Sequence, residues 1–262
     1  MEFSKNKRLS VNIITFNEGH KLKECLESVK WAKEIIIIDS FSTDNTKEVC
    51  SHYKNVKVFD YPFLGYGRLR NIAIEKSTGE WILSLDTDER VTEELKKEIL
   101  QVLTDNPPYD AFKIPRKSYF LGRWIKHCGW YPDYRSMQLF RKGVGEYTDY
   151  LAHDHFYLFK NGRVGTLKGH IEHITCLNLE EAFIKTQRYS SLMAQEMHKR
   201  GRRFHIHQLI SHPFAAFIRM YLFKLGFLDG IHGLILSINH AYYTFLKYAK
   251  LWRIEKSAYP GH

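Results

Sequence analysis

The sequence has little cysteine and no long apolar run, and both absences narrow what the protein can be. Four cysteines occur in 262 residues, and no two of them form a Cys-x-x-Cys pair: Cys25, Cys50, Cys128 and Cys176. Neither a disulfide framework nor a zinc site fits that spacing, so we expect a protein of the reducing cytosol. No stretch reaches 18 uninterrupted apolar residues, which argues against a membrane-spanning helix. Residues 1–8 have no apolar core, so we expect no secretory signal.

Signatures of nucleic-acid binding are also missing, although the chain is strongly basic. The formal net charge is +10, and basic residues become denser toward the C-terminus. Such a balance favours acidic partners, namely nucleic acid, an anionic membrane or phosphorylated substrates. The sequence contains no zinc finger and no aromatic RNA-binding signature, so we expect no nucleic-acid partner. A phosphate-bearing ligand or an anionic membrane surface remains.

The first hundred residues contain a regular alternation of strand and helix patterns. Short β-branched or apolar runs at 9–15, 34–39, 56–59 and 81–85 alternate with segments of helical spacing. The run at 34–39 has no polar alternation, as is typical of a parallel strand covered on both faces. We therefore predict an α/β fold with a doubly wound, mainly parallel sheet.

The most informative motif follows the fourth predicted strand, which leads directly into Asp86-Thr87-Asp88. Side chains alternate along an extended chain, so the two aspartates would project to the same side. Two carboxylates held that close repel each other unless a cation lies between them. Their hard oxygen ligands suit Mg²⁺ or Mn²⁺, with phosphate oxygens completing the coordination. Because open α/β sheets bind ligands at the carboxyl ends of their strands, the pair indicates handling of a nucleoside diphosphate.

Other polar side chains converge on the same predicted edge of the sheet. Asp39 ends the second strand, where it could accept hydrogen bonds from a base or ribose. Arg68 and Arg70 begin the third helix, where a guanidinium group could reach a base or phosphate. The first strand ends in further polar groups: Thr15, Asn17 and Glu18. Taken singly, each is more often a helix cap or a surface charge, but together they predict a nucleotide site.

Four segments together resemble the family 2 glycosyltransferases with the GT-A fold: residues 10–18, 38–46, 65–71 and 86–90. Four later segments are similar to the lipopolysaccharide-core β-glucosyltransferase branch: residues 114–117, 120–123, 129–133 and 224–230. The resemblance covers nearly the whole chain. It implies an inverting transfer of a hexose, with glucose favoured, from a UDP-sugar to inner-core lipopolysaccharide or another lipid-linked saccharide.

The resemblance also implies roles for individual residues. Asp88 would bind a divalent metal, Mn²⁺ or Mg²⁺, and Asp86 would contact ribose or the metal. His173 matches a histidine of the relatives and is a further candidate metal ligand, although a lone histidine is more often structural. Relatives have a His-Glu pair where this chain has His153-Asp154, so Asp154 is the candidate general base, with a side chain one methylene shorter. Asp133 is the rival candidate.

The resemblance divides the chain into a nucleotide-sugar-binding half over 1–106, an acceptor-binding half of the same GT-A domain over 107–178, and a helical C-terminal segment over 179–262. In the last segment, Phe and Leu residues share a face beside Arg219 and Lys224. This pattern favours helices that lie in the plane of an anionic membrane. It is equally compatible with packing on the main domain or on a second subunit. The first interpretation predicts a cytoplasmic enzyme, peripheral to the inner face of the cytoplasmic membrane; the oligomeric state stays open.

Two other functions are compatible with part of the pattern. A sugar-phosphate nucleotidylyltransferase also combines an α/β nucleotide domain with a metal, but it would need a glycine-rich basic phosphate loop, which is missing between Leu9 and Leu22. A non-catalytic nucleotide-sugar-binding membrane protein is the second alternative, and the intact Asp-x-Asp motif argues against it.

Overall fold

The computed structural model describes residues 8–134, 137–149 and 155–257, and the chain forms two compact units. The first unit comprises Met1–Arg116 and Asp133–His173, and the second comprises Lys117–Pro132 and Ile174–His262. The chain therefore leaves the first unit twice and returns to it once. The three segments proposed from the sequence stay a prediction beside this division.

Every strand and helix predicted in the first hundred residues is present. They are β1 (Leu9–Thr15), α1 (Gly19–Val29), β2 (Glu34–Asp39), α2 (Thr46–Ser51), β3 (Val56–Asp60), α3 (Tyr66–Lys76), β4 (Trp81–Asp86) and α4 (Glu93–Asp105). All six residues of β2 are buried, as its apolar run predicts. The Thr92 side chain caps α4 by accepting a hydrogen bond from the Leu95 amide at 3.2 Å, and Asn106 ends the helix in the left-handed conformation.

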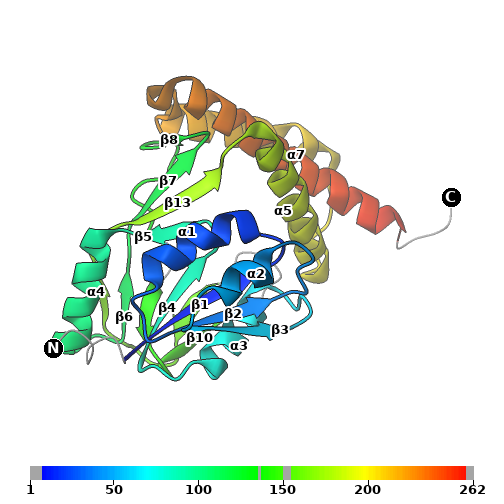
Figure 1. Ribbon diagram of the computed structural model, residues 1–262. Coiled ribbons are helices and arrows are strands. Elements are labelled where there is room, and N and C mark those ends of the chain that lie inside the picture. The colour runs from blue at the N-terminus through cyan, green and yellow to red at the C-terminus, as the bar shows by residue number, and fades with distance from the viewer. Residues whose placement is uncertain (1–7, 135–136, 150–154, 258–262) are drawn as a thin grey trace. The chain divides into compact units, whose positions relative to one another are not determined.

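The central sheet of the first unit has seven strands in the order β12-β6-β9-β4-β1-β2-β3, with β6 (Ala111–Lys113), β9 (Met137–Arg141) and β12 (Val164–Thr166) (Figure 1). Strand β1 pairs in parallel with both β2 and β4, and β2 pairs in parallel with β3. Only β9 runs antiparallel to its neighbours β4 and β6. The predicted doubly wound, mainly parallel sheet is therefore confirmed, and its order reverses at β1, where open α/β sheets bind ligands.

Helices cover both faces of this sheet and bury its apolar side chains. Leu22 and Leu26 of α1 and Ile99 of α4 pack with alternate residues of β1, β2 and β4 on one face. Leu69 and Ala73 of α3 pack on the opposite face against Ile14, Ile36 and Ile38. The strand ends stay outside these two apolar layers and carry the polar residues.

Short strands that the sequence pattern did not predict complete the fold: β5 (Glu89–Val91), β7 (Arg116–Phe120), β8 (Arg123–Trp124), β10 (Gly145–Tyr147), β11 (Phe156–Leu158) and β13 (Ile171–Cys176). They form a four-stranded sheet in the order β5-β13-β7-β8 and a two-stranded sheet of β10 and β11. The predicted strands at 109–115 and 136–141 are present as the shorter β6 and β9. Strands β5, β8, β10 and β11 have only two or three residues each, too few to show an alternating pattern, so their pairing partners define them.

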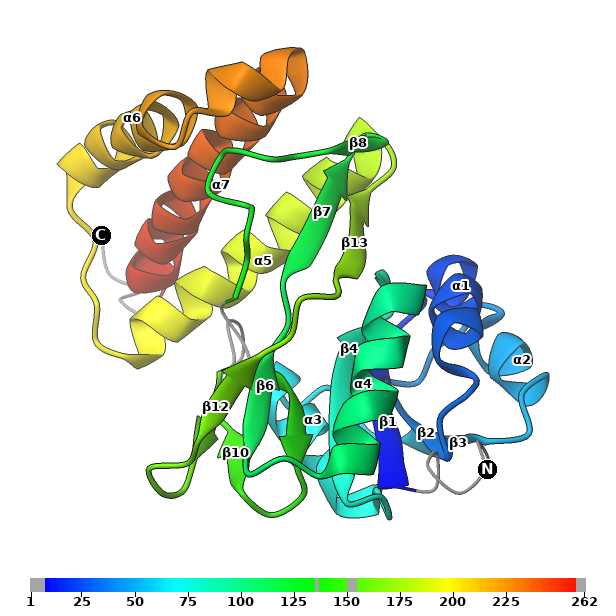
Figure 2. The ribbon, with the colours of Figure 1, turned by 90° about the vertical axis from the view of Figure 1, so that its left-hand side faces the viewer.

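The second unit is largely helical and has its own apolar core. It contains α5 (Leu179–Lys199), η3 (Ile206–Leu209), α6 (Ser211–Ile218), the π-helical turn η4 (Arg219–Phe223), η5 (Gly226–Asp229) and α7 (Gly230–Ser257). Helix α7 packs on both α5 and α6 (Figure 2). Within the described residues no single helix has the length and apolar character to cross a membrane. The pair Ile206–Phe223 and Gly226–Lys256, bent by 70°, meets both criteria when taken together.

Candidate active site

Asp86 at the carboxyl end of β4 forms an ion pair with Arg70 of α3. The Arg70 guanidinium lies 2.5 Å from Asp86 Oδ1 and donates to Ser84 Oγ at 2.8 Å. It also lies over the ring of Tyr147, 5.4 Å from the centroid. Asn71, next to Arg70, holds β10, the strand of Tyr147. Its side-chain amide donates to the Tyr147 carbonyl, and its side-chain oxygen accepts a hydrogen bond from the Tyr147 amide. Helix α3, through Arg70, therefore fixes the side chain of Asp86, the first aspartate of the Asp-x-Asp motif.

Asp88 lies in a turn and contacts a histidine. Strand β4 ends at Asp86, and Thr87 and Asp88 form the turn into β5. The expectation that Asp86 and Asp88 project from one extended strand is therefore wrong, because the strand ends at Asp86 and Asp88 lies in the turn that follows. Asp88 Oδ1 lies 3.5 Å from Nε2 of His173, which is on β13 opposite Glu89. The structure thus joins two predicted metal ligands, Asp88 and His173, that are 85 positions apart in the chain.

Glu89 is a central residue of this region that the sequence analysis did not select. Its side chain is 1% exposed and accepts a hydrogen bond from the Asp86 amide at 3.0 Å. Arg116 donates to Glu89 at 3.0 Å, and Gln138 lies 3.4 Å from both carboxylate oxygens. Arg116 also forms a close ion pair with Asp133. Glu89 could have been identified from its position: it directly follows the motif and begins a short strand whose other buried residue is Val91.

Burial and the neighbouring charge of Asp86 raise the pKa of Glu89, and the positive charge of Arg116 opposes that shift. Burial lowers the pKa of Arg116, but the carboxylates of Glu89 and Asp133 outweigh this and raise it. Asp133, the rival candidate base, is thus buried against a permanent cation. Its role as the base stays a prediction.

The residues after β1 connect two loops at the same sheet edge. The Asn17 side chain accepts a hydrogen bond from the Thr43 amide at 2.7 Å, and the Asn17 amide donates to Ser42 Oγ at 2.8 Å. The Glu18 amide donates to the Thr46 hydroxyl at 3.2 Å. By contrast, the Thr15 hydroxyl is buried and has no hydrogen-bond partner within the described part of the chain. A buried hydroxyl without a partner is costly unless a ligand supplies one, which fits the predicted nucleotide role of Thr15.

Asp39 and Arg68, the other predicted nucleotide ligands, differ in their surroundings. Asp39 is fully buried, and both of its carboxylate oxygens accept hydrogen bonds from the amide and hydroxyl of Ser42. The Lys47 ammonium lies 3.8 Å from it. Arg68 is exposed on α3. The first candidate base, Asp154, lies outside the described residues.

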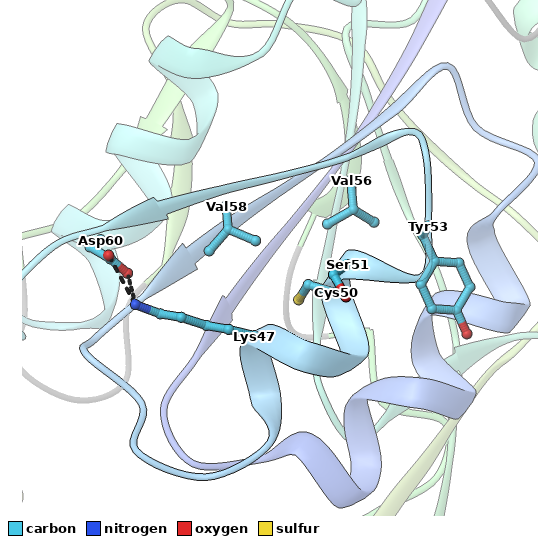
Figure 3. Close-up of a pocket in the computed structure, with 7 residues that line it drawn as sticks. All are labelled: Lys47, Cys50, Ser51, Tyr53, Val56, Val58 and Asp60. Atoms are coloured by element: carbon cyan, nitrogen blue, oxygen red, sulfur yellow. Dashed lines mark hydrogen bonds and ion pairs between the residues drawn. The ribbon is translucent and has the colours of Figure 1, made fainter.

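A shallow pocket of about 380 Å³ lies between α2 and β3 in the first unit (Figure 3). It is lined by Lys47, Cys50, Ser51, Tyr53, Val56, Val58 and Asp60. Figure 3 shows the Lys47 ammonium directed at Asp60, 2.8 Å from its Oδ1. Because Lys47 also contacts Asp39, one cation links this pocket to the carboxyl end of β2.

The donor groups at the β4 end fit a divalent cation that shares its coordination with a substrate. Two ligands of one cation, each about 2.1 Å from it, are separated by roughly 3–4 Å, and the Asp88 to His173 distance of 3.5 Å is in that range. The described residues contain no group of three or more His, Cys, Asp or Glu side chains that could hold a metal ion. A cation here would therefore need ligands from a bound diphosphate or from water.

The comparison with protein families assigns the chain to a family. The model of "Glycosyl transferase family 2" matches residues 10–160. This match covers more than half of the chain and includes β1, β2, β4 and the Asp-x-Asp motif. The chain belongs to glycosyl transferase family 2, and it is a glycosyltransferase with the GT-A fold that the sequence motifs predicted.

Several relatives and solved structures match this chain over nearly its full length. The lipopolysaccharide core biosynthesis glycosyltransferase LpsC of Rhizobium meliloti (strain 1021) is 29% identical over 254 residues, covering 94% of this chain and 92% of LpsC. An uncharacterized glycosyltransferase of Rickettsia typhi is 28% identical, covering 94% and 87%. The structure of S. aureus TarS 1-349 in complex with UDP-GlcNAc has a TM-score of 0.56 at 18% identity, covering 96% and 92%. That of the mannosyltransferase PcManGT from Pyrobaculum calidifontis, in complex with GDP-Man and Mn²⁺, has a TM-score of 0.56 at 14% identity, covering 94% and 87%.

Proposed function

We propose that this glycosyltransferase moves a hexose, with glucose favoured, from a UDP-sugar to a lipopolysaccharide inner-core or other lipid-linked saccharide, with inversion and with a divalent metal, Mn²⁺ or Mg²⁺. The observation that carries the proposal is the strand-end cluster at β4, in which Asp86 pairs with Arg70 and Asp88 with His173. Similarity to LpsC over 94% of the chain supports the choice of acceptor.

The donor would bind along the carboxyl ends of β1, β2 and β4. Thr15 offers a buried hydroxyl that has no partner among the described residues. Asp86 has one carboxylate oxygen held by Arg70, which leaves the other oxygen for a ribose hydroxyl or the metal. Asp88 and His173 would hold the cation, which when bound neutralises charge that develops on the leaving diphosphate. The positive charge of Arg70 supplements that stabilisation from the protein side.

The acceptor hydroxyl must lose its proton to a positioned base as the new glycosidic bond forms. Asp154 is the candidate in the sequence. Asp133 is the alternative, although its carboxylate is engaged by Arg116. A base already paired with a buried guanidinium is a weak proton acceptor, because the cation stabilises its ionised form. We therefore propose Asp154 as the base.

The second unit would bring the enzyme to the inner face of the cytoplasmic membrane. Several large apolar side chains of its bent helix pair are exposed: Phe214, Leu222, Phe223, Leu225, Phe227, Leu228 and Ile231. Arg219 and Lys224 are exposed in the same region. Of the other basic residues there, Lys250 is engaged by Gln187, Ser190 and Ser191, so its charge is turned toward α5. Apolar insertion supported by a few cations is typical of an in-plane membrane helix.

A donor screen tests the proposed reaction. Purified enzyme is incubated with UDP- and GDP-linked sugars, with Mn²⁺, Mg²⁺ or EDTA, and release of the nucleoside diphosphate is followed with and without a truncated lipopolysaccharide acceptor. We expect UDP release from one UDP-hexose, stimulated by the acceptor and abolished by EDTA. NMR of the product then gives the anomeric configuration. Release from GDP-sugars alone, or undiminished release in EDTA, would contradict the proposed donor or the metal requirement, respectively.

A further inference from the structure

The hairpin of β7 and β8 in the second unit places two lysines opposite each other. Leu121 and Gly122 form its two-residue turn, and both have positive φ, as a type I′ turn requires. Such a turn fixes the register, which pairs Tyr119 with Trp124. The Ile125 amide donates to the Ser118 carbonyl at 2.9 Å, so the pairing continues beyond β8. In this register Lys117 lies opposite Lys126.

The two faces of the hairpin differ in character, because side chains alternate along each strand. Phe120 and Ile125 are buried in a core cluster with Cys128, Cys176 and Met220. The other face carries two aromatic and two basic side chains, which we call the lysine–tryptophan face: Lys117, Tyr119, Trp124 and Lys126. All four are at least partly exposed.

Both ammonium groups of this face are held by the same indole ring. Lys117 Nζ lies 5.2 Å and Lys126 Nζ 4.8 Å from the centroid of the Trp124 ring. Tyr131 packs edge-on against that ring at 5.2 Å and fixes its orientation. A cation–π contact positions an ammonium group but does not neutralise it, so two positive charges are concentrated here.

No carboxylate among the described residues compensates these charges. Neither Lys117 nor Lys126 takes part in an ion pair there. The acidic residue bound to this loop, Asp229, is buried and accepts hydrogen bonds from the backbone amides of Lys126 and His127 and from the His127 ring. Like charges directly opposite each other destabilise a pair of strands. An anion bound between them removes that cost.

We propose that the lysine–tryptophan face binds a phosphate group carried by the acceptor saccharide, an inference that rests on the proposed function. Compact ammonium groups suit phosphate oxygens, and the rings of Trp124 and Tyr119 offer an apolar surface on which a sugar ring can pack. A membrane headgroup fits less well, because none of the exposed large apolar side chains lies in residues 117–132. The exposed apolar groups that would enter a bilayer belong to α6, η4, η5 and α7 instead.

Binding of a deacylated, phosphorylated core oligosaccharide tests this proposal by calorimetry. The probes are that oligosaccharide, the same material dephosphorylated with hydrogen fluoride, UDP with Mn²⁺, and vesicles of anionic phospholipid. The test variant is Lys117→Gln/Lys126→Gln. The matched control, Lys199→Gln/Lys256→Gln, removes the same net charge from exposed positions of the same unit. We expect the test variant to bind the phosphorylated probe roughly tenfold or more weakly, since a charge-assisted hydrogen bond contributes about 1.5–3 kcal/mol.

The remaining results separate this proposal from the alternatives. The dephosphorylated probe should bind the wild type and the test variant equally, and UDP affinity should be the same in all three proteins. Equal loss in the control variant, equal affinity of wild type and test variant, or no binding of the phosphorylated probe would each overturn the proposal. A loss confined to anionic vesicles would overturn it in favour of a membrane contact. Failure of UDP to bind would instead count against the proposed function, whatever the oligosaccharide does.

Discussion

The two units differ in whether certain charged side chains have partners within the chain. In the first unit the acidic groups are matched: Asp86 by Arg70, Asp133 by Arg116, and Glu34 by Lys57. In the second unit Lys117 and Lys126 have no acidic partner in the described chain, and exposed apolar side chains such as Phe223 belong to the same segment as the exposed Arg219 and Lys224. A stable fold satisfies its buried charges internally, whereas uncompensated cations and exposed apolar groups indicate partners outside the chain. This contrast supports the proposal that the first unit binds the donor and that the second binds the acceptor and a membrane surface.

The largest expected effect is that of Asp88→Asn, which we expect to reduce transfer to the background rate while the protein stays folded. A neutral amide replaces an anionic metal ligand but keeps the size of the side chain. Initial rates with the donor identified by the screen, measured beside thermal melting, check this outcome. Asp105→Asn at the exposed end of α4 is the matched control and should keep full activity. A folded Asp88→Asn enzyme with normal activity would contradict the proposed metal site.

Substitution of the base should be the next largest effect. We expect Asp154→Asn to lower kcat by roughly 10²–10⁴ with nearly unchanged donor affinity, because a general base acts in the transition state. Asp133→Asn should behave differently. It leaves Arg116 without one buried partner, so we expect a loss of about 3 kcal/mol in the free energy of unfolding as well. Kinetics combined with denaturant unfolding distinguish the two. If Asp133→Asn is fully stable and has the kinetic defect while Asp154→Asn is active, Asp133 is the base.

The pH dependence of stability tests how strongly the first unit stabilises the ionised form of a buried carboxylate. Burial by itself raises the pKa of Glu34, but hydrogen bonds from Lys57, Ser10 and Thr78 outweigh it and bring the pKa to about 2, from 4.5. A lowered folded-state pKa contributes stability above the unfolded value and loses it as the pH falls toward the folded value. We therefore expect Glu34→Gln to lower the free energy of unfolding by about 3 kcal/mol at pH 7.

The same difference should shrink as the pH falls below 4.5, be small near pH 2, where Glu34 is half protonated in the folded protein, and disappear at still lower pH, where both proteins are uncharged at this position. Urea unfolding of both proteins over that range measures it. Glu75→Gln on the exposed surface of α3 serves as the control, and its curve should follow the wild type. A constant gap between Glu34→Gln and the wild type at every pH would show that packing, and not ionisation, is responsible.

The smallest expected effect concerns the surface of the second unit. Phe223 is 78% exposed, and burial of a phenylalanine contributes about 1.5–3 kcal/mol. We expect Phe223→Ser to weaken binding to anionic vesicles by roughly tenfold, and added salt to weaken it further. Co-sedimentation over a salt series measures both. Phe159→Ser, an equally polar change at an exposed site of the first unit, should have no effect. Recovery of the wild type in the supernatant with or without vesicles would assign this surface to a subunit contact.

How much of the fold and of the site could be predicted from the sequence depends on how far apart in the chain the residues that determine each feature lie. The elements of the first hundred residues follow from local patterns, because a buried parallel strand such as 34–39 needs an unbroken apolar run and α4 needs its Thr92 cap. Strands β5, β8 and β10 have two or three residues each and no pattern of their own. The burial of Glu89 could not be predicted for the same reason, since it is buried beside residues that are distant in the chain, namely His173 on β13, Arg116 and Gln138.

The sequence by itself determined the fold class, the family and the place of the Asp-x-Asp motif at a strand end, because these depend on short-range periodicity and on residues adjacent in the chain. The tertiary structure decided which charges meet. It placed His173 beside Asp88, Arg70 beside Asp86 and Arg116 between Glu89 and Asp133. It also showed that Asp86 ends a strand whereas Asp88 lies in the turn that follows, so the two do not share one strand face. Contacts between residues far apart in the chain arise from strand pairing and helix packing, which no local pattern records.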